Sequence, residues 1–351
     1  MAESENQKTN QKVWTLPEGV GSKFFIAGEI DYNIRLEIDD STLHGNMQTA
    51  GAAFDAWALI FHTFFGSDIK LQLALKSGVE LPKWPESEDV LLGEYGHYNR
   101  FLYRLMKFNQ VYGAKEGWFT IADPRLSEAV ARFEQSLGNC HFFNNVGDGE
   151  AKTDSDSAEN LVEALFADQN QELLRKNTPG TDVESIYRKL PVGLFKRDAA
   201  KQKKHGDKKP HNDISVFPGG GSQTDLWGLS SDKKTLVIYE LKTTQNSGDA
   251  NKSVGVISEL MFYCNYVYDM YIAENNLSPL SPKDAKVSHP RSGYLSLLDA
   301  YNNGSLTDVQ GYILTDELHP LITSEVLAEM SKSGIQYQVI PYKKNGSQIM
   351  I

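Results

Sequence analysis

Two short apolar runs separated by a polar stretch constrain the fold of this chain most. The first run is Asp225-Leu-Trp-Gly-Leu, and the second is Leu236-Val-Ile-Tyr-Glu-Leu-Lys242. Five polar residues, Ser230 to Lys234, follow the first run as a turn candidate. This pattern is typical of a β-hairpin, because each run is long enough for one strand and the polar residues suit a turn.

Glu240 and Lys242 place opposite charges on one face of the second strand, because residues two apart in a strand project to the same side. A regular turn centred after Asp232 puts Asp225 directly opposite Glu240, with Cβ atoms ~5 Å apart. Facing carboxylates repel one another unless a cation lies between them. Hard oxygen ligands favour Mg²⁺ in that position. The alternative is a surface ion-pair network on an exposed face of the sheet.

Helix and strand patterns on both sides of the hairpin predict an α/β domain over residues 151–351, with a mixed central sheet flanked by helices. A closing strand–helix–strand unit normally contributes parallel strands to such a sheet. The expected elements are a helix over 158–176, a helix over 254–274, a strand over 311–315, a helix over 324–333 and a strand over 337–342.

Residues 1–150 predict a separate, helix-rich α+β domain of unknown role, which begins with a disordered tail over 1–12. Apolar and polar residues alternate from Ile30 to Ile38, as in a half-buried strand. The polar segment over 144–157 is the best linker candidate. Helices are expected over 50–65, 95–112 and 126–137.

The net charge of -11 argues, taken alone, against a nucleic-acid partner, because phosphate contacts need Lys and Arg. Residues 1–160 carry a net charge of -10, however, and the rest of the chain only -1. Residues 186–213 contain nine basic and three acidic residues. This stretch is either a solvated loop or a track for phosphates. Its candidate nucleic-acid contacts are Lys201, Lys203, Lys204, Lys208 and Lys209.

The spacing of the charged hairpin residues resembles the PD-(D/E)xK nuclease superfamily, whose members share the restriction-endonuclease-like fold. Asp225 is followed by fourteen residues and then by Glu240-Leu241-Lys242, and the resemblance covers roughly residues 157–345. The expected helices and the closing strand–helix–strand unit stand where that family places them. The family's proline is absent, because Thr224 precedes Asp225.

The resemblance implies roles for the matching residues. Asp225 and Glu240 would hold Mg²⁺, for which Mn²⁺ can substitute, together with the backbone carbonyl of Leu241. Lys242 would orient or activate the attacking water. The family often has a further glutamate in its first core helix, and Glu163 is the candidate here, with Glu159 as its competitor.

The helix after the motif often carries a glutamine and a tyrosine four residues apart in this family, on one helix face. This chain has Glu259 and Tyr263 at that place. Glu259 either supplies a further metal ligand or shows that the helix is aligned differently. The ordinary alternative places both residues on the helix surface and at the edge of the core.

The resemblance implies a magnesium-dependent endonuclease, a hydrolase of phosphodiester bonds with DNA as substrate, and a restriction or defence role fits such a module. The alternative is a catalytically inactive nuclease-fold module that binds nucleic acid or assembles with a partner. A third reading is a metal-dependent enzyme acting on another phosphate or nucleotide ester. The presence of Asp225, Glu240 and Lys242 together favours the enzyme.

A cytoplasmic protein without a membrane partner is expected. No apolar run approaches the ~20 residues that a membrane helix needs, and the polar residues 1–11 lack the apolar core of a signal peptide. Cys140 and Cys264 form no close pair, as is usual in a reducing compartment. The sequence is compatible with a homo-oligomer.

Overall fold

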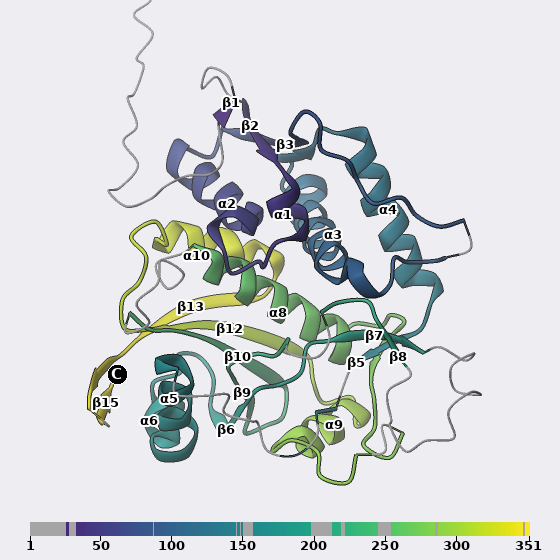
Figure 1. The fold of residues 1–351 in the computed structure, drawn as a ribbon. Helices are drawn as coiled ribbons and strands as arrows, with labels where there is room; N and C mark the ends of the chain where they lie inside the picture. The colour runs from purple at the N-terminus through teal and green to yellow at the C-terminus, as the bar shows by residue number, and fades with distance from the viewer. Residues whose placement is uncertain are drawn as a thin grey trace, which may run out of the picture.

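The computed structural model describes a mixed α/β chain, and the description covers residues 26–27, 33–86, 88–144, 146–147, 149, 157–197, 213–218, 222–244, 254–284, 287–346 and 348–351. Four sheets and the helices around them make up this part of the chain (Figure 1). Within it, no helix combines the length and the apolar character that a bilayer crossing requires.

The central sheet has the strand order β13-β12-β10-β9-β6. β10 is antiparallel to β9 and parallel to β12, which in turn is parallel to β13, so the predicted mixed sheet is confirmed. Its strands are β6 (Val183–Arg188), β9 (Leu226–Ser230), β10 (Thr235–Lys242), β12 (Asp308–Thr315) and β13 (Gln336–Pro341).

The predicted hairpin and its register are confirmed. Leu229 pairs with Leu236, and Leu226 pairs with Tyr239, as a turn centred after Asp232 requires. The turn residue Lys233 has a positive φ of 61°. Because side chains alternate along a strand, Leu236 and Ile238 enter one buried core, whereas Val237 and Tyr239 enter another on the opposite face.

Helices cover both faces of the central sheet (Figure 1). α8 (Gly255–Tyr271) packs on β10 and β12 from one side. α5 (Ala158–Ala164) and α6 (Gln171–Lys176) pack on β10 and β6 from the other side. The remaining C-terminal helices are α9 (Tyr294–Asn302) and α10 (Ser324–Met330), and a hairpin of β14 (Lys343–Asn345) and β15 (Gln348–Met350) closes the chain.

The helix predicted over 158–176 is wrong as one continuous element. It is interrupted by a π-helical segment, Leu165–Gln169, between α5 and α6. The backbone N–H of Asn170 donates to Leu165 O at 2.9 Å, and its side-chain amide donates to the same oxygen at 2.8 Å. The asparagine side chain thus competes with regular helical bonding at this place.

The N-terminal elements form a second layer over α8 (Figure 1). Their strands are β1 (Ile26–Ala27), β2 (Asn33–Ile38), β3 (Lys70–Leu75) and β4 (Phe119–Ile121), in that order across one sheet. Their helices are α1 (Asp40–His44), α2 (Phe54–Phe65), α3 (Gly96–Phe108) and α4 (Pro124–Asn139). The helices predicted over 50–65 and 126–137 and the described portion of the strand, 33–38, are confirmed. The helix predicted over 95–112 is α-helical over 96–108 and continues as a π-helical segment, Asn109–Lys115.

The N-terminal and C-terminal elements share one buried core. This core includes Trp57 of α2 and Phe101 of α3 together with Ile257 of α8. A further sheet also joins the two parts, with the order β11-β5-β7-β8. Its strands are β5 (Phe142–Asn144), β7 (Leu194–Arg197), β8 (Asp213–Ser215) and β11 (Leu277–Pro279).

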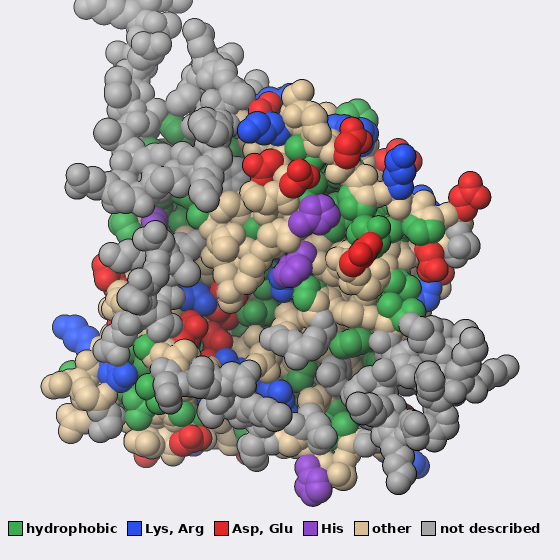
Figure 2. Space-filling model, in the orientation of Figure 1, with side chains coloured by type: hydrophobic (Ala, Val, Ile, Leu, Met, Phe, Trp, Pro, Cys, Tyr) green, Lys and Arg blue, Asp and Glu red, His purple; other side chains and the backbone are tan. Residues whose placement is uncertain are grey.

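The boundary near residue 150 stays a prediction, since 150–156 lie outside the described residues. Acidic side chains are scattered over the upper part of the face in Figure 2, where Figure 1 draws the N-terminal elements. This distribution accords with the net charge of -10 in residues 1–160.

Candidate active site

Lys242 ends β10 and brings together three carboxylates, one from its own strand and one from a helix on each side of the sheet. Its Nζ lies 2.6 Å from Glu240 Oε1 of the same strand. The same ammonium group lies 3.0 Å from Glu259 Oε2 of α8 and 3.5 Å from Glu159 Oε1 of α5. Glu240 and Glu259 are 2% and 1% exposed, so two of these three carboxylates are almost completely removed from water.

Asp225 lies directly before β9 and touches the strand that carries the motif. Its Oδ2 accepts a hydrogen bond from the backbone N–H of Leu241 at 2.9 Å. Its Oδ1 lies 3.3 Å from Nζ of Lys189, the residue that follows β6. Lys189 also donates to Glu163 of α5, and Arg188 Nη2 lies 3.4 Å from the other oxygen of that carboxylate.

The two lysine-centred groups form one acidic cluster at the carboxyl end of β10. Three basic side chains are ion-paired with five carboxylates, which leaves a formal charge of -2 when all are ionised. The cluster consists of Arg188, Lys189, Lys242, Asp225, Glu159, Glu163, Glu240 and Glu259. Four buried carboxylate oxygens of the cluster have no hydrogen-bond partner among the described residues: Glu159 Oε1, Glu240 Oε2 and both oxygens of Glu259. Glu159 Oε1 and Glu259 Oε2 are ion-paired with Lys242.

Burial and repulsion act together on the carboxylates. Burial, followed by the nearby Asp225 and Glu259 charges, raises the pKa of Glu240 well above its usual range. Burial and then Asp225 raise the pKa of Glu163 to about 8. For Asp225, burial opposes ionisation, but Lys189, Lys242 and the Leu241 amide outweigh it and lower its pKa.

The donor set fits a hard divalent cation in chemistry and charge. Carboxylate oxygens are preferred Mg²⁺ ligands, and buried oxygens without a hydrogen-bond partner cost free energy unless something positive approaches them. Within the described residues, however, no three Asp, Glu, His or Cys side chains converge as a ready ligand set. The ammonium groups of Lys242 and Lys189 lie against these carboxylates instead. A metal ion at Asp225 and Glu240 would therefore share these carboxylates with Lys189 and Lys242, and Glu240 Oε2 is an oxygen without a hydrogen-bond partner among the described residues.

The two candidate glutamates of the first core helix are both in the cluster. Glu163 faces Lys189, and Glu159 faces Lys242. Tyr263, one turn after Glu259, is buried, and burial followed by the Glu259 and Glu240 charges raises its pKa well above the usual range. The five lysines proposed as nucleic-acid contacts between Lys201 and Lys209 lie outside the described residues.

Some residues of the site were not singled out from the sequence. Arg188 and Lys189 were counted only as part of the basic stretch over 186–213. Their position was a signal, since Arg188 ends β6 and Lys189 follows it, as Lys242 ends β10. Arg291 donates to Lys189 O at 2.9 Å and to Gln223 Oε1 at 2.7 Å, and no sequence pattern marked it.

The N-terminal layer also reaches the site. Arg100 of α3 is 6% exposed, and its Nη1 lies 3.4 Å from Ser222 Oγ, three residues before Asp225. Burial lowers the pKa of Arg100, although the charges of Tyr263 and Glu259 oppose that effect. The sequence placed Arg100 in a helix of unknown role.

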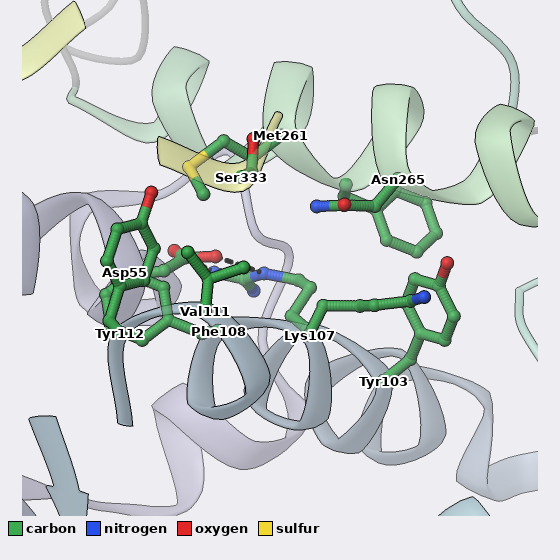
Figure 3. A pocket seen from close by; sticks show the side chains of 11 residues that line it. Asp55, Tyr103, Lys107, Phe108, Val111, Tyr112, Met261, Asn265 and Ser333 are labelled. Atoms are coloured by element: carbon green, nitrogen blue, oxygen red, sulfur yellow. Dashed lines mark hydrogen bonds and ion pairs between the residues drawn. The ribbon is translucent and has the colours of Figure 1, made fainter. Parts of the chain in front are cut away.

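Two hollows of the described structure do not include the cluster. One, between α3 and α8, has a volume of about 10 Å³, which is room for about one water molecule (Figure 3). Asp55, Lys107 and Asn265 are among its lining residues. The other, of about 270 Å³, is lined by Cys140, His141, Phe143, Lys196, Ser278 and Leu280.

Comparisons with models of known protein families, with curated proteins and with solved structures give no match.

Proposed function

We propose that the chain is a metal-dependent endonuclease of restriction-endonuclease-like architecture that hydrolyses phosphodiester bonds in DNA. The observation that carries the proposal is the acidic cluster at the carboxyl end of β10. It gathers five carboxylates around three basic groups and includes buried carboxylate oxygens without a hydrogen-bond partner among the described residues. DNA is chosen as the substrate because the superfamily that Asp225, Glu240 and Lys242 resemble cuts mostly DNA.

Different residues of the site would hold the metal ion and orient the attacking water. Asp225 and Glu240, with the carbonyl of Leu241, would hold a Mg²⁺ ion. When bound, this ion lowers the pKa of its water and offsets charge on the phosphate. The amide of Leu241 fixes Asp225, because it donates to Oδ2 at 2.9 Å. Lys242 would orient the attacking water and face the negative phosphate.

Plasmid cleavage tests the proposal. Supercoiled plasmid is incubated with the full chain in Mg²⁺, in Mn²⁺ and in a chelator, beside Glu240→Gln, which keeps the shape of the side chain and removes its charge. Glu172→Gln is the matched control, because this α6 carboxylate is 75% exposed. We expect cleavage by the wild type and by Glu172→Gln only with the divalent ion. Equal cleavage by Glu240→Gln refutes the assignment.

A catalytically inactive nuclease-fold module is the second candidate, and one observation favours it. The carboxylates already have ammonium partners, and the described residues offer no converged set of three metal ligands. A module of this kind would shift plasmid or oligonucleotide DNA in a gel equally with Mg²⁺ and with a chelator, and would cut neither. Metal-dependent cleavage eliminates this candidate.

A further inference from the structure

Lys189 has a backbone conformation that is rare for lysine. Its φ is 58°, in the left-handed region that a Cβ disfavours. The backbone N–H donates to Asp225 O at 3.0 Å, and the carbonyl accepts from Arg291 Nη1 at 2.9 Å. Surrounding contacts therefore hold Lys189 in a strained conformation from both sides, which is a feature found mostly at functional sites.

The ammonium group of Lys189 contacts two carboxylates from different parts of the fold. Nζ lies 3.3 Å from Asp225 Oδ1 and donates to Glu163 Oε1. The side chains of Lys189 and Glu163 are 10% and 0% exposed, so this contact is largely shielded from water. A shielded pair of carboxylates needs a positive partner, and a divalent cation would satisfy the same oxygens.

We propose that the Lys189 ammonium occupies a cation position between Asp225 and Glu163 and keeps a divalent ion out of it. The inference rests on the proposed function, in which Asp225 and Glu240 hold a metal ion. Its consequence is that the site takes this single ion and no second one. Lys189 is then a positioning residue. It holds Asp225 for that ion and supplies the charge that a second ion would otherwise bring.

The number of Mn²⁺ ions bound per chain tests the inference without an activity assay. Lys189→Gly removes the ammonium group and suits the positive φ, because glycine adopts it without strain. Lys189→Met keeps the bulk of the side chain, and Lys189→Arg keeps the charge. Lys176→Met is the surface control, since Lys176 is 72% exposed. Binding is measured by calorimetry and by the spin-resonance signal of free Mn²⁺.

We expect the Gly and Met variants to bind one Mn²⁺ more than the wild type, and Lys189→Arg and Lys176→Met to bind the same number. Adding Glu163→Gln to Lys189→Gly should abolish the gain. The inference is overturned if neither uncharged variant gains an ion, or if neither folds in excess Mn²⁺, since the ion should replace the ammonium group. If the wild type binds no Mn²⁺, the proposed function is refuted instead. The inference is tested separately, by whether the Lys189 variants bind one ion more than the wild type.

Discussion

Breaking the buried ion pair between α3 and α2, whose carboxylate also accepts a hydrogen bond from α8, should destabilise the whole chain. Arg104 of α3 lies 2.5 Å from Asp55 Oδ1 of α2 and donates to Oδ2 at 3.0 Å, and both side chains are 3% exposed. Ser258 of α8, the neighbour of Glu259, donates to the same carboxylate. Arg104→Met leaves the Asp55 charge buried, with hydrogen bonds from Ser258 and from the Ala56 amide, which donates at 3.0 Å, as its remaining contacts among the described residues.

The expected loss is about 3–5 kcal/mol, the usual cost of removing one partner of a buried pair. Because the core is continuous from α2 to α8, we expect one transition. For 351 residues unfolding together, an unfolding entropy of about 0.7 kcal/mol/K converts this loss into a Tm decrease of about 4–7 °C. Far-ultraviolet circular dichroism and tryptophan fluorescence should report the same midpoint in denaturant and on heating.

Arg35→Met provides the matched control, because Arg35 and its partner Glu37 are 45% and 31% exposed. Its cost should stay below about 1 kcal/mol. Arg104→Met combined with Asp55→Leu should recover much of the loss, since an apolar pair replaces an unpaired charge. The reasoning fails if Arg104→Met costs no more than Arg35→Met. Two separate transitions would instead favour independent domains divided near residue 150.

Three further changes should have separable effects. Lys242→Met should reduce plasmid cleavage at least about 100-fold, whereas Mn²⁺ binding, measured by calorimetry, should persist. Loss of both cleavage and binding would show that Lys242 acts through the metal ligands. Gly311→Ala should cost about 1–3 kcal/mol in urea unfolding, because a Cβ there would lie 2.8 Å from Cys264 Sγ of α8; an unchanged midpoint contradicts this close packing. Burial lowers the pKa of His62 below its reference of 6.5, although its bond to Ile69 O opposes the effect, so the His62 contribution to stability should be full above pH 6.5 and decline below it. His62→Gln should remove that part of the pH dependence, and equal wild-type and variant slopes between pH 7.5 and 5 would contradict the assignment.

The local geometry of strands made part of the site predictable from the sequence. Alternation along β10 places Glu240 and Lys242 on one face whatever packs against it. The apolar runs and the polar turn fixed the register of β9 and β10, which the structure confirms. The position of Asp225 beside the end of β10 follows from that register, because neighbouring strands bring residues close over a short loop.

Contacts between distant segments decided the rest of the site. Lys189 reaches Asp225 and Glu163 because β6 pairs with β9 and because α5 packs on the side of the sheet opposite α8. Residue spacing left Glu159 and Glu163 as competitors, whereas packing gave each glutamate its own lysine. The sequence by itself determined the strand pair and its charged face, since both depend on covalent periodicity. Only the tertiary structure assembled five carboxylates around three basic groups, because those contacts depend on long-range packing.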